Sequence, residues 1–204
     1  MPGRQGYATE FHYEPENAND TTAQRFLAHF IQDNGMLDLN IVGDGGSTPF
    51  LSLRDGLEGI RLSTQIGGLN HPNLITHTHV LISLESLVTN LVSVDFDIQN
   101  PLDTDMVIEF VQAEGSVNGT VYAFFGQRFE GGLVVPSGQT VNSGVFGNVL
   151  LTQGAIASLD IVPLGVLDIN TGTTVRIGGK DGYEIPWLEI SQTNVPTTYD
   201  LDLV

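Results

Sequence analysis

The feature that most constrains the fold of this chain is the alternation of apolar and polar residues between Leu91 and Phe110. Apolar residues at Val92, Val94, Phe96 and Ile98 alternate with polar residues at Ser93, Asp95, Asp97 and Gln99. A period of two predicts a β-strand with one buried face and one solvent face. Asn100-Pro101 ends this run, because proline has no N–H to donate to a strand ladder. We therefore expect Phe96 and Ile98 in the core and Asp95 and Asp97 at the surface.

Similar alternating segments follow along most of the chain, separated by glycine, proline and asparagine. Asn118-Gly119 lies between two of them and predicts a two-residue hairpin turn. Residues 21–34 instead have a helical pattern, with threonines that can cap the first turn, and a second short helix is indicated around Ala155. Short strands separated by frequent turns predict an all-β sandwich or barrel with one or two short helices.

The charge balance excludes several classes of partner. The 204 residues include 24 acidic and 7 basic ones, for a net charge of −17. Nucleic acid and anionic membrane surfaces both require clustered lysine and arginine, so neither is an expected partner. The chain has no cysteine, and no apolar run approaches the roughly 20 residues that a membrane helix requires.

The order of several motifs resembles a known superfamily. A strand ending in Asn100-Pro101 is followed by VNGTVYA, by VVPSGQT and by a further apolar run. This order resembles the late embryogenesis abundant type 2 superfamily. It is closest to a fungal family of unknown function whose members occur as tandem repeats in secreted or membrane-tethered proteins. The resemblance implies an antiparallel fibronectin/immunoglobulin-like β-sandwich, without catalytic residues or a cofactor, in which Asn100 and Pro101 have a structural role.

The polar composition of residues 1–20 and the same resemblance together suggest a division of the chain and a location. Residues 1–20 are expected to be a mobile arm, residues 21–46 a helix-strand segment that is the tail of a preceding repeat or part of this unit, and residues 47–204 the sandwich. The implied location is extracellular or cell-wall associated, as a fragment of a larger secreted protein. Glycosylation sequons at Asn19 and Asn118 would then be available for modification.

Candidate site residues are few. His77 and His79 form an H-x-H pair on one face of a strand, a pattern found in zinc sites. Asp95, Asp97, Asp103 and Asp105 are candidates for calcium ligands or for a glycosidase pair. No calcium-loop motif or serine-nucleophile motif is present, and solvated strand faces explain the same residues. We therefore expect no metal and no catalytic site.

The expected function follows from these observations and from the resemblance. The chain is predicted to be a non-enzymatic extracellular module with a structural or protein-interaction role. Its partners would be other copies or neighbouring repeats, bound through edge strands whose backbone groups are free to pair. The alternative is a lipid-binding or lipid-transfer module that uses an apolar groove between the sheets.

Overall fold

The computed structural model describes residues 21–32, 36–42, 61–69 and 74–202. Its helices are α1 (Thr21–Gln32), α3 (Ser86–Thr89), α4 (Ala155–Ser158) and the 3-10 helix η1 (Leu159–Leu164). Its strands are β1 (Met36–Val42), β2 (Arg61–Gly67), β3 (Ile75–Ser83), β4 (Leu91–Gln99), β5 (Met106–Val117), β6 (Thr120–Val135), β7 (Thr140–Asn142), β8 (Phe146–Leu151), β9 (Val166–Ile177) and β10 (Tyr183–Asp202). No helix in this described part of the chain is long and apolar enough to span a membrane.

Residues 75–202 form a closed barrel of seven strands, in the order β3-β10-β9-β5-β6-β8-β4, with β4 returning to β3. The all-β class is confirmed, but the predicted fibronectin/immunoglobulin-like sandwich is wrong. The sheet closes because β3 has a partner on each side, pairing antiparallel with β4 and parallel with β10. Closure leaves no long edge on the sheet, whereas a sandwich keeps exposed edge strands on both of its sheets.

The closure depends on a bend in β10. This strand pairs with β9 through Pro196, and its last residues, from Thr197 onward, pair with β3. Two register shifts along its ladder with β9 allow the strand to change direction. Where β3 and β10 are not paired, Gln192 spans the gap: its buried amide accepts from Ile75 N at 2.9 Å and donates to Ile75 O at 3.0 Å.

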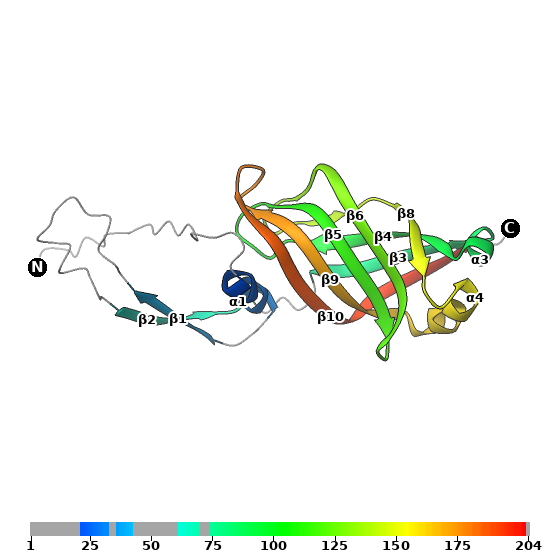
Figure 1. Cartoon of the computed structure of the whole chain (residues 1–204), viewed down its shortest axis with the longest axis horizontal. Helices are drawn as coiled ribbons and strands as arrows, with labels where there is room; N and C mark the ends of the chain where they lie inside the picture. The colour runs from blue at the N-terminus through cyan, green and yellow to red at the C-terminus, as the bar shows by residue number, and fades with distance from the viewer. Residues whose placement is uncertain (1–20, 33–35, 43–60, 70–73, 203–204) are drawn as a thin grey trace, which may run out of the picture.

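The inward faces of the strands form two apolar clusters, one toward each end of the barrel. The first contains Val80, Val94, Ala113, Val149, Ile161 and Val195, and the second contains Ile31, Met106, Val135, Val175, Leu188 and Ile190. Helices lie at both ends, with α1 at one and α3 and α4 at the other (Figure 1). The barrel is therefore filled by side chains and closed by helices rather than open along its axis.

Helix α1 packs onto the barrel of its own chain. Ile31 is 1% exposed and belongs to the second cluster, and Gln32 Nε2 donates to Ser191 O of β10 at 2.8 Å. Strands β1 and β2 form a separate antiparallel ribbon beyond α1 (Figure 1). The predicted arm at residues 1–20 and the stretch from 43 to 60 lie outside the described residues.

Candidate functional site

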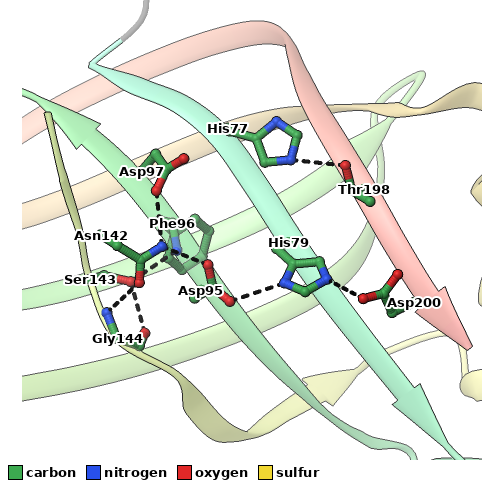
Figure 2. Close-up of polar contacts among 10 residues, drawn as sticks. All are labelled: His77, His79, Asp95, Phe96, Asp97, Asn142, Ser143, Gly144, Thr198 and Asp200. Atoms are coloured by element: carbon green, nitrogen blue, oxygen red, sulfur yellow. Dashed lines mark hydrogen bonds and ion pairs between the residues drawn. The ribbon is translucent and has the colours of Figure 1, made fainter. Parts of the chain in front are cut away.

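The most extensive polar network lies on the outer surface of the barrel and centres on His79 (Figure 2). His79 Nδ1 lies 3.2 Å from Asp95 Oδ2, and His79 Nε2 lies 2.8 Å from Asp200 Oδ2. The register explains this arrangement, because Asp95 is directly opposite His79 on β4 and Asp200 lies on the same face of β10, two residues beyond the partner of His79. One imidazole thus joins three neighbouring strands.

Asn142 extends the network to β7. Its amide nitrogen donates to Asp95 Oδ1 at 2.8 Å and to Asp97 Oδ1 at 2.9 Å. Its side-chain oxygen accepts from Gly144 N at 2.9 Å, which fixes the amide orientation. Asp95 and Asp97 share a face of β4, so a single amide holds both carboxylates in place.

The pKa of His79 is raised above its usual value. The hydrogen bond with Asp200 is the largest cause, desolvation acts in the opposite direction, and the hydrogen bond with Asp95 raises the pKa further. Both carboxylates stabilise the imidazolium form, in which each ring N–H donates one hydrogen bond. Both ring nitrogens of His79 are therefore engaged, and both of their partners favour the protonated ring.

His77 lies on the same face of β3, as the H-x-H spacing predicts. Its Nε2 is 2.9 Å from the hydroxyl of Thr198, so the two histidines have different partners. Within the described residues, no group of three or more His, Cys, Asp or Glu side chains is arranged to hold a metal ion. His77 and His79 therefore take part in contacts between strands.

Asp103 and Asp105 follow the bend after β4 and do not join the His79 network. Asp103 is exposed, and Asp105 Oδ1 accepts a hydrogen bond from Ser137 N at 3.1 Å. Of the six candidate ligands named from the sequence, His79, Asp95 and Asp97 are therefore connected through the network. His77 has a separate contact with Thr198, and Asp103 and Asp105 lie apart in the loop after β4.

Asn100 is fully buried at the bend between β4 and β5. Its side-chain nitrogen donates to Thr104 O and to Val135 O, both at 2.8 Å, and its side-chain oxygen accepts from Leu102 N at 3.0 Å. Pro101 follows it in the loop. The Asn100 amide thus satisfies three backbone groups that the end of the strand would leave unpaired.

Asn118 and Gly119 form the turn between β5 and β6. Their φ angles are 49° and 78°, and Val117 pairs with Thr120 across the turn. Positive φ at both central residues is type I′ geometry, which matches the twist of a hairpin. Asn118 is also exposed, as a glycosylation site requires, whereas Asn19 lies outside the described residues.

Two members of the network are not identifiable from the sequence alone. Asp200 lies 121 residues after His79, on a strand that pairs with β3 in parallel. Asn142 lies on a three-residue strand that has no alternating pattern of its own. The sequence indicates only that Asp200 lies on the polar side of an alternating segment. This pattern predicts the face of the strand on which Asp200 lies, but not the strand or the side chain beside it.

Comparisons with known proteins leave the family of this chain open. No family model matches the sequence, and no curated protein matches it. A crystal structure of a protein from Archaeoglobus fulgidus is similar over 50% of this chain and 81% of that chain, with 13% identity and a TM-score of 0.28. A likeness this low does not indicate a shared fold, so the resemblance to the late embryogenesis abundant type 2 superfamily stays a prediction.

Proposed function

We propose that this chain is a non-enzymatic, extracellular β-barrel module that has a structural role and assembles with other copies or with neighbouring repeats. One observation supports the structural role above all: each ring nitrogen of His79 contacts a carboxylate on an adjacent strand. A general base needs a ring nitrogen free to take a proton from a substrate. His79 instead cross-links β4, β3 and β10.

The β1–β2 ribbon supports the assembly part. Its seven residue pairs join β1 to β2, and in the described part of the chain neither strand pairs with any other. Each strand therefore has an outer edge of backbone N–H and C=O groups that an added strand can satisfy. A two-stranded ribbon is also marginally stable alone, so a third strand would stabilise it.

Sedimentation velocity of the full chain, across about a hundredfold range of concentration, tests self-association by mass action. We expect a monomer in equilibrium with larger species. A monomer at every concentration would contradict assembly through copies of this chain.

Because the native chain has no cysteine, single cysteines can locate the contact. Asn40→Cys places a thiol on an exposed position of β1, and Val88→Cys places one on α3, where Val88 is 84% exposed. Strand addition between two copies of β1 predicts that oxidised dimers form readily for Asn40→Cys and poorly for Val88→Cys. Equal yields from the two variants would show that the ribbon is not the contact.

A further inference from the structure

One seam of the barrel is closed mainly by side chains. Strands β6 and β8 pair through two residue pairs, Ala123 with Leu151 and Phe124 with Leu150. Thr152 and Gln153, just after β8, add hydrogen bonds to the backbone of Val121 and Tyr122. In the other direction no ladder is described, although β6 continues to Val135 and β8 begins at Phe146. The ladder between β4 and β8 has three pairs, and the other neighbouring strands around the ring share longer ladders. This is therefore the part of the wall that can open with the least loss of backbone hydrogen bonds.

Phenylalanine rings fill the unpaired part of the seam. The Phe125 and Phe146 ring centroids are 5.4 Å apart, and Phe129 meets Phe146 edge-on at 5.7 Å. Phe96 of β4 lies behind them, with its centroid 5.2 Å from that of Phe125. These rings exclude water without hydrogen bonds, so they can move aside by rotation of side chains.

Two apolar cavities lie inside the barrel behind these rings. Their volumes are about 50 Å³ and about 40 Å³, and Phe96, Ala113 and Phe125 line both of them. Movement of the two shared phenylalanine rings would join the cavities into one channel. Among the described residues that line them, no side chain is charged. An ionised ligand would have no counter-charge there, so the cavities suit an uncharged one.

The second cavity also contains hydroxyl groups without a partner. Thr78 and Tyr199 both line it, and Thr78 Oγ1 and Tyr199 OH are buried without a hydrogen bond. Thr78 is 1% exposed, and burial raises the pKa of Tyr199 to about 12, so this phenol stays neutral. Buried polar atoms are nearly always hydrogen-bonded, and an unmatched hydroxyl lowers stability. The second cavity is therefore lined by two residues whose hydroxyls a bound polar head would satisfy, whereas the first is lined by one, Thr171.

We propose that the barrel interior binds an uncharged single-chain amphiphile with a hydroxyl head. The head lies between Thr78 and Tyr199, and the chain runs past Phe96 and Phe125 into the first cavity. The ligand enters at the seam between β6 and β8 as the phenylalanine rings move outward. This site goes beyond the structural role proposed above and does not depend on it.

The size of the cavities requires this movement. A volume of about 50 Å³ or about 40 Å³ accommodates a few water molecules rather than an alkyl chain. A chain is therefore accommodated only when the rings leave part of the space that they fill. The seam lets them do so while the ladders of the other strands stay intact.

The first test compares head groups, using calorimetric titration of the full chain with 1-decanol, decane and decanoate at about pH 8, where decanoate is ionised. We expect 1-decanol to bind, decane to bind about tenfold more weakly for lack of the hydroxyl, and decanoate not to bind. In the double variant Thr78→Val, Tyr199→Phe, the preference for 1-decanol over decane should disappear. Absence of 1-decanol binding, equal binding of decanoate, or an unchanged preference in the double variant would overturn the proposal.

A high-resolution structure of crystals soaked in 1-decanol distinguishes bound 1-decanol from ordered water in the cavity. Electron density for a chain with its hydroxyl at Thr78 and Tyr199 is the expected result. Ordered waters that remain on these two hydroxyls while 1-decanol is present would overturn the proposal.

The second test concerns the entrance. Phe146→Ala removes a ring from the seam, and we expect it to speed association of 1-decanol severalfold in stopped-flow measurements. Phe124→Ala is the matched control, because Phe124 lies on β6 at the same seam but is 38% exposed. Equal association rates for the two variants would overturn the proposed entrance. If circular dichroism shows that Phe146→Ala is unfolded, Phe146→Leu gives the same comparison with a smaller change in volume.

Discussion

Phe96 lies where the two apolar clusters of the barrel meet. It is 7% exposed, stacks on Phe125, and lies with its ring centroid 6.0 Å from that of Phe146. The alternation along β4 predicts this inward orientation, because Phe96 shares a face with Val92 and Val94, which are also buried. Ile98 on the same face is half-buried, and so are the two aspartates that alternate with these residues.

Phe96→Ala is expected to lower the free energy of unfolding by about 3–5 kcal/mol, because burial is lost and a cavity forms. Urea titration followed by fluorescence of Trp187, the single tryptophan, measures the change. Val88→Ala is the control, since Val88 is 84% exposed and its truncation should change stability by less than about 0.5 kcal/mol. A loss below about 1 kcal/mol for Phe96→Ala would contradict a core position.

A second prediction at the scale of single residues concerns Asn100. Asn100→Ala leaves Leu102 N without its acceptor and removes the donor to Val135 O, and both of these hydrogen bonds are buried. We expect a loss of about 2–3 kcal/mol of unfolding free energy, from buried backbone groups left unpaired. Asn170→Ala, at an exposed position on β9, is the control and should have little effect. Equal losses for the two variants would show that the bend does not depend on the Asn100 amide.

At the scale of elements, His79 connects β3 to both of its neighbours. The carboxylates that face it come from β4 and β10, and the further charge nearby is Asp97, which is held by Asn142. The pKa of His79 is raised in the folded chain. Its contribution to stability is therefore fully present below the ordinary histidine value of about 6.5 and is lost as pH rises through the folded pKa.

The difference in unfolding free energy between the native chain and His79→Gln should consequently be larger at about pH 6 than at about pH 8.5. Urea titrations at both pH values measure it. The control is the same substitution in an Asp200→Asn chain, where the largest cause of the raised pKa is absent, so the difference should vary less with pH. A difference for His79→Gln that is the same at both pH values, or larger at the alkaline one, would contradict the raised pKa.

Helix α1 is the second element whose role can be measured. Ile31 is 1% exposed at the end of the barrel, whereas Met36, at the start of β1, is 61% exposed. Ile31→Ala is expected to cost about 2–4 kcal/mol, and Met36→Ala less than about 0.5 kcal/mol. Thermal unfolding of both variants gives the comparison. If both variants have the same melting temperature as the native chain, the helix does not contribute to the stability of the barrel.

For the whole molecule, the charge of −17 is the dominant long-range property. Repulsion between copies at pH 7 opposes association, and it falls as the carboxylates protonate toward the sequence pI of about 4.2. We expect reversible association to strengthen as the pH falls from 7 to about 4.5, measured by sedimentation with circular dichroism to verify that the chain stays folded. A folded chain that associates no more at the acid end than at pH 7 would show that charge is not what keeps copies apart.

The sequence by itself determined the local structure. Period-two alternation placed the strands and the buried face of β4, the two positive-φ positions at Asn118-Gly119 produced a hairpin, and the apolar face of residues 21–32 produced a helix. It also indicated a short helix around Ala155, where α4 and η1 lie. These features depend on interactions between residues close in the chain, so their patterns are visible without a fold.

Only the tertiary structure decided that the strands close into a barrel and which side chains meet. Alternation specifies which face of a strand is buried but not which strand lies beside it, so a sandwich and a barrel have the same pattern. The parallel pairing of β3 with β10, together with the antiparallel pairing of β3 with β4, closes the ring and excludes the predicted open sandwich. The same pairing brings Asp200 to His79 across 121 residues and places the hydroxyls of Thr78 and Tyr199 in one cavity. Such contacts arise from long-range packing energy, which no short segment of this chain encodes on its own.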